Sequence, residues 1–203
     1  MIAIVDYGMG NLRSVQKAFQ KIGADVVITS NPRDIDDSKG IVLPGVGAFK
    51  DCMTNLEQFG IVDAIKQSIK KGKPFLGICL GLQSLFEGSE EFGSSEGLGV
   101  FAGRVLRFRE VGLKIPHMGW NQVSFVNKPD YLGNIPDNSF FYFVHSYHVV
   151  PTSMDIVSGI TNYGYDFVSM IYKDNVIATQ FHPEKSQTIG LEFIKGFYRF
   201  VSS

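Results

Sequence analysis

Apolar residues follow two different spacings along the first part of the chain, up to about residue 90. Short, uninterrupted apolar runs predict strands at residues 2–5, 26–28, 41–43 and 75–78. Between and after these runs, apolar residues at helical spacing predict helices, in the sets Leu12, Val15, Phe19 and Ile22, then Ile61, Val62, Ile65 and Ile69, then Leu82, Leu85 and Phe86. Strands that alternate with helices predict a parallel sheet, and a wholly apolar strand such as 75–78 is typical of a sheet covered on both faces.

The pattern changes after about residue 97, where helical spacing gives way to a series of strands. The predicted strands are 100–108, 120–126, 140–150, 156–161, 167–172 and 176–181. Asp174-Asn175 between the last two is typical of a hairpin turn. The chain then ends in a predicted helix whose apolar face is Ile189, Phe193, Ile194, Phe197 and Val201. We expect one α/β domain over residues 1–203, with a mostly parallel sheet flanked by helices and an antiparallel extension.

The composition limits the kinds of partner that the protein can bind and indicates its cellular compartment. The chain has 203 residues, 44% of them hydrophobic and 19% charged, with a net charge of −1. Such a charge gives no electrostatic basis for binding nucleic acid or an anionic membrane. Its two cysteines form no disulfide framework, and no apolar run approaches the ~18 residues of a membrane span. The chain begins directly with a predicted strand and has no secretory leader, so we expect a cytoplasmic protein with free thiols.

The sequence Gly77-Ile78-Cys79-Leu80-Gly81 lies where the apolar strand 75–78 meets the next predicted helix. It has the pattern of a nucleophile elbow, Gly-x-Ser-x-Gly, with cysteine in place of serine. A thiol there lies at the carboxyl edge of the sheet and at a helix N-terminus, which favours the thiolate. The alternative is a structural cysteine packed among small residues, because free cysteine also packs as a hydrophobe.

A nucleophilic thiol needs a base, and the base needs a group that orients it. Of the four histidines, His182 is placed best, because His182-Pro183-Glu184 follows the last strand and precedes the last helix. One ring nitrogen can take the thiol proton while Glu184, two positions on, holds the other nitrogen. The pattern therefore predicts a Cys79, His182 and Glu184 triad.

A glycine-rich loop after the third strand can supply the oxyanion hole that such a triad requires. Gly45 and Gly47 bracket Val46, whose backbone N–H is then free to face a reacting carbonyl together with the N–H of Leu80. The alternative is an ordinary strand-to-helix loop. It is not a phosphate-binding loop, because no GxxxxGK is present and Gly8-x-Gly10 lacks a third glycine.

Metal binding is the competing use of cysteine and histidine. His145 and His148 lie three positions apart in one predicted strand, so we expect their side chains on opposite faces. Cys52 lies in a helical stretch with no histidine nearby. We therefore expect no metal site and no other cofactor.

With these segments assembled, the chain resembles the class I glutamine amidotransferases, or triad glutaminases, along nearly its whole length. Within them it is similar to the glutaminase subunits of imidazole glycerol phosphate synthase, of histidine biosynthesis. The matching motifs are Asp-Tyr-Gly-Met-Gly-Asn-Leu at 6–12, Leu-Pro-Gly-Val-Gly-Ala-Phe at 43–49, Gly-Ile-Cys-Leu-Gly-Leu-Gln at 77–83, Pro-His-Met-Gly-Trp-Asn at 116–121 and Gln-Phe-His-Pro-Glu-Lys-Ser at 180–186. The motifs at 44–49 and 116–121 point to the histidine pathway in particular.

The resemblance implies a flavodoxin-like fold and a division of labour between two chains. Cys79 attacks the side-chain amide of glutamine, His182 transfers protons, Glu184 orients His182, and a thioester is hydrolysed to glutamate. Positions that hold glutamine in the family match Gly47, Gln83, Ser146 and Tyr147. The ammonia passes to a (β/α)₈ cyclase/synthase subunit, bound as a heterodimer, that makes imidazole glycerol phosphate and an aminoimidazole carboxamide ribonucleotide.

The same resemblance predicts where the partner binds. Asn11 and Trp120 match family positions on the docking face, and Lys185 follows the triad directly and is expected on its rim. Two other interpretations remain open at this point: a cysteine peptidase or hydrolase on a similar fold, and a binding subunit that has lost its activity. Ammonia release from free glutamine without peptide cleavage separates them.

Overall fold

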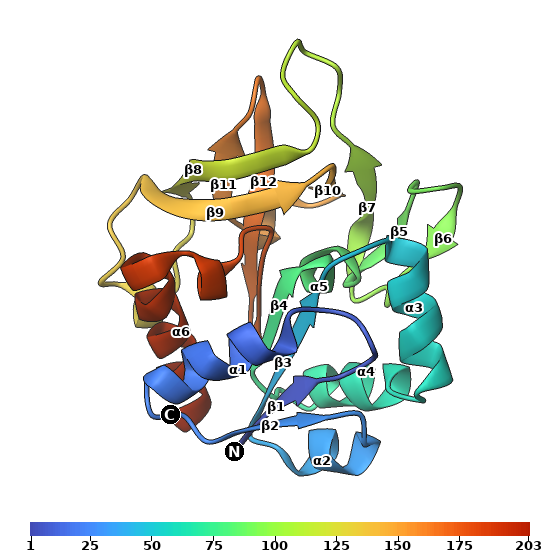
Figure 1. Ribbon diagram of the computed structural model, residues 1–203, viewed down its shortest axis with the longest axis vertical. Helices are drawn as coiled ribbons and strands as arrows, with labels where there is room; N and C mark the ends of the chain where they lie inside the picture. Colours follow the sequence, from blue (N-terminus) through green and yellow to red (C-terminus); the bar gives the residue numbers. More distant parts are fainter.

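The computed structural model describes residues 1–203 and is built around one large sheet flanked by helices (Figure 1). The strands are β1 Ile2–Val5, β2 Val26–Thr29, β3 Gly40–Gly45, β4 Phe75–Cys79, β5 Phe86–Ser89, β6 Ser95–Glu96, β7 Phe101–Arg107, β8 His117–Phe125, β9 Ser139–His145, β10 Tyr147–Pro151, β11 Val157–Asn162, β12 Asp166–Lys173 and β13 Val176–Thr179. The helices are α1 Leu12–Lys21, α2 Pro32–Asp37, α3 Phe49–Gln58, α4 Val62–Lys70, α5 Leu80–Gln83 and α6 Gln187–Ser202, with 3₁₀ turns η1 Asp130–Leu132, η2 Met154–Ile156 and η3 Pro183–Lys185. No helix is long and apolar enough to cross a bilayer.

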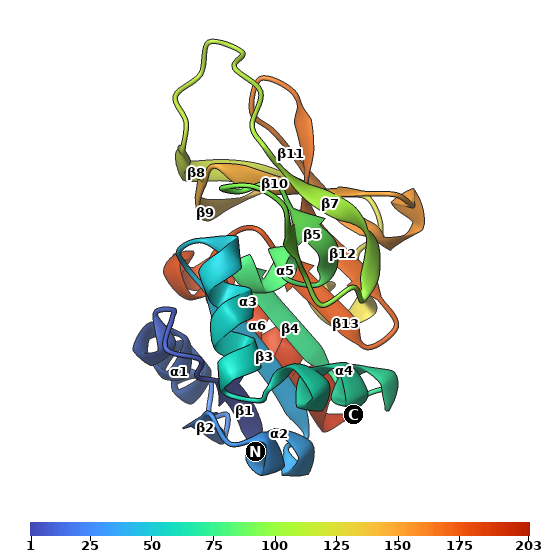
Figure 2. The same ribbon diagram turned by 90° about the vertical axis from the view of Figure 1, so that its right-hand side faces the viewer.

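The parallel half of the sheet has the order β2-β1-β3-β4-β13 and is covered on both faces. In β1, Ile2 and Ile4 pack in the core that includes α1 and α6, whereas Ala3 and Val5 pack in the core that includes α2, α3 and α4. The two views show the same two layers of helices on either side of the strands (Figures 1 and 2). Successive side chains of a strand point to opposite faces, so an apolar run is what a doubly covered sheet requires. The predicted parallel α/β arrangement is confirmed.

The antiparallel half continues the same sheet from β13 through β12, β10, β7, β5 and β6. Strands β12 and β13 form the predicted hairpin, with Asp174 at φ +52° in its turn. Strand β11 branches from β12 and leads to the paired strands β8 and β9, which cross above the carboxyl ends of the parallel strands in Figure 1. The predicted antiparallel extension is present, and it contains more strands than the parallel half.

The predicted helix through Leu82, Leu85 and Phe86 is wrong beyond its first turn. Helix α5 ends at Gln83, and Phe86 begins β5 instead. The carbonyl groups of Ser84 and Leu85 accept hydrogen bonds from the backbone at 98–101 rather than from a continuing helix. A pairing with a distant segment has therefore replaced the local helical bonds.

The predicted strand 140–150 is two strands, because the chain changes neighbours at Ser146. Up to His145 it pairs with β8, and from Tyr147 it pairs with β7. The expectation that His145 and His148 point to opposite faces of one strand is wrong for the same reason. Both rings pack against Phe108, at centroid distances of 5.0 and 4.8 Å.

Candidate active site

Cys79 ends β4 in a sharp turn that the glycines on either side of it permit. Its φ is +55°, in the left-handed region that residues other than glycine rarely adopt. A Cβ at Gly81 would lie 1.9 Å from the Leu43 carbonyl oxygen, and one at Gly77 would lie 2.7 Å from the Gly81 carbonyl oxygen. The two glycines let the backbone pass closely on both sides, and Cys79 is held at the carboxyl edge of the sheet.

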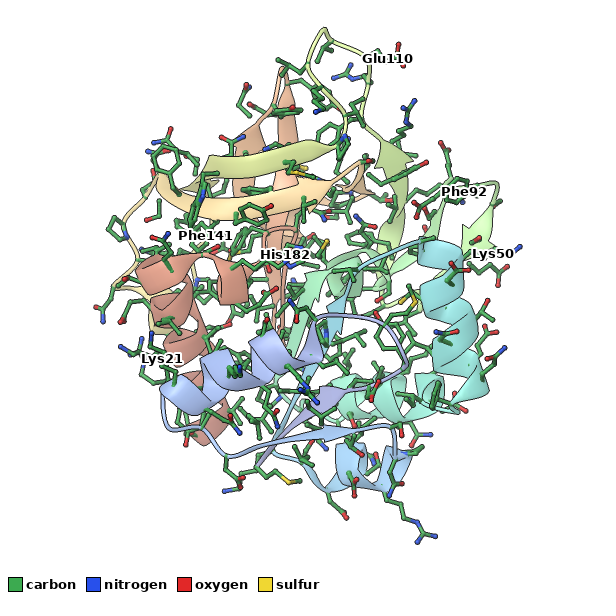
Figure 3. All side chains as sticks on the ribbon, viewed as in Figure 1. Lys21, Lys50, Phe92, Glu110, Phe141 and His182 are labelled. Atoms are coloured by element: carbon green, nitrogen blue, oxygen red, sulfur yellow. The ribbon has the colours of Figure 1, made fainter.

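The strand register brings His182 to the same edge. Strand β13 runs parallel to β4 with Thr179 opposite Ile78, so the residues after Thr179 emerge next to Cys79. His182 precedes the 3₁₀ turn η3, which folds Glu184 back toward it. Nδ1–H of His182 donates to Glu184 Oε1 at 2.8 Å, and both side chains are only 2% exposed. Figure 3 shows His182 in the interior, between the β8–β9 pair and α1 in that view.

The charges around His182 determine its protonation. Burial by itself would lower the pKa of His182, but the Cys79 sulfur and the Glu184 carboxylate together raise it to about 10. Nε2 is buried and has no hydrogen-bond partner at normal distance, so it is available to exchange a proton with Cys79. The raised pKa favours the imidazolium form of His182 next to Cys79 at neutral pH, with Glu184 holding the ring.

A cavity of about 450 Å³ opens over Cys79. The six residues predicted for the oxyanion hole and for substrate binding all line it: Val46, Gly47, Leu80, Gln83, Ser146 and Tyr147. Its size fits a small ligand, and its walls come from the parallel half and from the antiparallel extension together. The structure thus brings these predicted residues to one place.

Sequence reasoning missed two polar side chains of this site. Glu91 lines the cavity and accepts a hydrogen bond from the Phe49 N–H at 2.7 Å. It lies between β5 and β6, strands that the sequence did not predict. Gln180 donates from Nε2 to Cys79 Sγ at 3.5 Å. Gln180 lies in the predicted strand 176–181, but nothing in that segment indicates that the strand runs beside β4 and brings Gln180 to Cys79.

Of the three predicted docking residues, Lys185 lines the cavity, and Trp120 and Asn11 lie on neighbouring elements. Trp120 on β8 is 45% exposed, and its ring lies 6.1 Å from that of Tyr142 on β9. Lys185 lines the cavity and places Nζ 5.8 Å from the centre of the same tyrosine ring. Asn11 is exposed just before α1, and α1 contacts η3, which contains Lys185. The three residues therefore lie on neighbouring elements, and their contact with a partner stays a prediction.

The family model for glutamine amidotransferase class-I matches residues 3–199. The chain belongs to the class-I glutamine amidotransferases. It is 52% identical over 202 residues to "Imidazole glycerol phosphate synthase subunit HisH" of Geobacter metallireducens, covering 97% of this chain and 96% of that one. The subunit of the same name from Aquifex aeolicus is 51% identical over 197 residues, covering 97% and 95%. A solved structure described as a glutamine amidotransferase matches with a TM-score of 0.74 at 18% identity, over 100% of both chains, which shows the shared fold.

These relationships confirm the resemblance, the fold class and the glutaminase function in histidine biosynthesis. They favour an amidotransferase over the cysteine peptidase that the sequence pattern also allowed. They do not assign roles to individual residues.

Proposed function

We propose that this amidotransferase hydrolyses glutamine with a triad of Cys79, His182 and Glu184. The observation that carries the proposal is the adjacency of two parallel strand ends, one bearing Cys79 and the other leading to the buried His182–Glu184 pair. Cys79 lines the cavity together with Lys185, which directly follows Glu184, and the lining is partly polar. The single catalytic unit spans residues 1–203, because its groups come from both halves of the sheet.

In the first step the Cys79 sulfur attacks the side-chain amide carbon of glutamine. A C–S bond forms, and the carbonyl oxygen takes the negative charge of the tetrahedral intermediate. The backbone N–H of Leu80 begins α5, where helix N–H groups have no intrahelical acceptor, and we assign it with the N–H of Val46 to that oxygen. Donors fixed in place before the reaction stabilise the transition state more than the substrate.

In the second step the protonated His182 acts as an acid. Nε2–H gives its proton to the departing amide nitrogen, which leaves as ammonia while a thioester remains on Cys79. The neutral ring then takes a proton from water, which attacks the thioester and releases glutamate. Glu184 keeps the ring oriented through both transfers and stabilises its charged form.

The substrate-binding proposal rests on the groups that the cavity leaves available. Gln83 uses its amide N–H groups on Tyr147 and Gln180, and its Oε1 makes no hydrogen bond within the protein. That oxygen is therefore an acceptor for an N–H of glutamine. Gly47, Ser146 and Tyr147 also line the cavity.

We further propose that the chain works as one half of a heterodimer. The names of its relatives describe subunits of imidazole glycerol phosphate synthase. The partner would be the (β/α)₈ synthase subunit, which uses the ammonia to make imidazole glycerol phosphate and an aminoimidazole carboxamide ribonucleotide. Asn11, Trp120 and Lys185 would contact it.

The triad is tested in the assembled enzyme with Cys79→Ser. We expect glutamine-dependent synthesis to fall by on the order of 10⁴-fold or more, while synthesis from added ammonium salt stays close to wild type. Cys52→Ala is the matched control, because Cys52 is the other thiol and lies in the core away from the cavity. If Cys79→Ser kept more than about a thousandth of the glutamine turnover, Cys79 would not be the nucleophile.

A further inference from the structure

Three side chains form an unbroken line of hydrogen bonds from the substrate cavity to the sulfur. Gln83 Nε2 donates to the Tyr147 carbonyl at 3.1 Å and to Gln180 Oε1 at 3.1 Å. Gln180 Nε2 in turn donates to Cys79 Sγ at 3.5 Å. Gln180 is fully buried and Gln83 is 5% exposed, so water does not compete for these bonds.

The direction of each bond in this line is determined by a single acceptor. A backbone carbonyl can only accept, so Tyr147 forces the N–H side of Gln83 toward itself and toward Gln180. The oxygen of Gln180 must then face Gln83, and its N–H must face the sulfur. The reverse orientation of Gln180 would set N–H against N–H at one end and place an oxygen beside a thiolate at the other.

The backbone keeps Gln180 in this place. Its N–H donates to the Ser169 carbonyl at 2.8 Å, and the preceding residue, Thr179, pairs with Ile78 of β4. The side chain therefore leaves the end of one strand and meets Cys79 at the end of the next. Buried polar groups that are fully bonded in this way are held in one conformation.

We propose that Gln180 is a further catalytic residue, whose amide N–H, oriented through Gln83 by the Tyr147 carbonyl, stabilises Cys79 whenever its sulfur is a thiolate. A hydrogen bond to an ionised acceptor is stronger than one to a neutral acceptor, so the donor favours the thiolate over the thiol. It also acts when the thioester is hydrolysed: the C–S bond breaks, its electron pair returns to sulfur, and the proton of the attacking water goes to His182. This inference rests on the proposed role of Cys79 as nucleophile.

Two substitutions at position 180 separate the hydrogen bond from the packing. Gln180→Met keeps the length and most of the volume but removes the donor. Gln180→Glu keeps an acceptor for the Gln83 N–H and puts a negative oxygen where the donor was. Gln67→Leu, at an exposed position on α4, is the control for replacing a glutamine elsewhere.

The first measurement is the rate of Cys79 alkylation by iodoacetamide across pH, with labelled peptides identified by mass spectrometry. We expect the rising limb to move upward by about one pH unit in Gln180→Met, further in Gln180→Glu, and not at all in Gln67→Leu. Gln83→Met removes the hydrogen bond that orients Gln180 and leaves Gln180 itself unchanged. It should move the rising limb of the alkylation profile in the same direction, by a smaller amount. A merely structural role would lower thermal stability without this ordered displacement.

The second measurement is glutamine turnover in the assembled enzyme. We expect kcat/KM at neutral pH to fall about ten- to hundredfold in Gln180→Met, with much of the loss in kcat. The proposal would be overturned if Gln180→Met and Gln180→Glu gave the same alkylation profiles as wild type. If Gln180→Met fails to fold, Gln83→Met takes its place in this comparison. Failure of the proposed function is recognised separately, because then the wild-type complex itself would release no ammonia from glutamine while the alkylation test still applied.

Discussion

His182 and Glu184 lie side by side in the proposed triad, and we expect their removal to have unequal consequences. His182→Ala deletes the group that carries the proton, whereas Glu184→Gln keeps an acceptor of the same shape next to Nδ1. We expect kcat to fall by on the order of 10⁵-fold in the first variant and about 10²–10⁴-fold in the second. Steady-state kinetics in the assembled enzyme, with thermal unfolding as a check on folding, measure both. Equal losses would mean that Glu184 does more than orient and stabilise the ring.

The two thiols differ in environment, and a labelling experiment shows whether that difference controls reactivity. Burial raises the pKa of Cys52 to about 12, so this residue stays a neutral thiol, with no exposed surface. Cys79 lies in the cavity beside an imidazolium. We expect a glutamine-like electrophile to modify Cys79 and to spare Cys52, as read by mass spectrometry of the peptides. Preferential modification of Cys52 would contradict the proposed activation.

The turn between β4 and α5 tolerates almost no added volume. A methyl group at Gly81 would meet the Leu43 carbonyl oxygen at 1.9 Å, and that oxygen belongs to the backbone of β3. We expect Gly81→Ala to lower the free energy of unfolding by about 2–4 kcal/mol and to abolish glutamine turnover. Gly72→Ala is the control, because Gly72 has φ +83° but nothing within 4 Å of a Cβ, and it should cost only about 1 kcal/mol. Urea unfolding compares the two, and a loss at Gly81 no larger than at Gly72 would refute the close-contact argument.

Buried, neutral histidines lie in a row where β8, β9 and β10 meet. His145 Nδ1–H donates to the Tyr147 carbonyl, His117 Nδ1–H donates to His145 Nε2, and Asn121 donates to His117 Nε2. This order of donors and acceptors works only with uncharged rings. Burial lowers the pKa of His145, of the neighbouring His148 and of His117, whose pKa falls to about 4.

This cluster predicts a loss of stability in acid. A histidine whose folded pKa is depressed contributes its stability in full above the unfolded pKa of 6.5 and loses it as pH falls toward the folded value. We expect protonation of His117 to lower the free energy of unfolding of the protein by roughly 1–2 kcal/mol between pH 7 and pH 5. Urea unfolding of wild type and His117→Phe at both pH values measures it, and the variant should lose less stability than wild type on acidification. An equal loss in both proteins would show that the cluster does not set the acid limit.

Local sequence pattern predicted the parallel half well and failed where the pairing is not local. An apolar run such as 75–78 contains all the information for a buried strand, and Gly77 and Gly81, which flank Cys79, locate the proposed nucleophile. Nothing near Phe86 says that its backbone will pair with β7, and nothing near Ser146 says that the strand will exchange one neighbour for another there. These outcomes depend on the sheet as a whole, which spacing within one segment does not describe.

The site shows the same division at the scale of the whole molecule. Cys79, His182 and Glu184 were predicted because their roles demand particular residue types at strand ends. Gln180 and Glu91 were not, since glutamine and glutamate carry no comparable signature and only the assembled sheet places them. Gln180 reaches Cys79 because β13 lies beside β4, although the two residues are separated by 101 positions in the sequence.

If this chain passes its ammonia to a partner, as proposed, the partner has to close the mouth of the cavity, and we expect the docking face around Lys185 and Trp120. Lys185 lines the cavity, and the Tyr142 ring lies next to both Lys185 and Trp120, at 5.8 Å from Nζ and 6.1 Å from the tryptophan ring. Exposed tryptophan is common at the centre of protein interfaces, and a lysine at the rim controls orientation and association.

We expect Trp120→Ala to weaken binding of the synthase subunit by about ten- to hundredfold. We expect Lys185→Ala to weaken binding less and to reduce partner-stimulated ammonia release. Titration with the synthase subunit measures both, and Lys50→Ala, on α3, should have no effect. If the Trp120 and Lys185 variants bound and responded as wild type does, the partner would have to dock elsewhere, and the ammonia would need a different exit from the cavity.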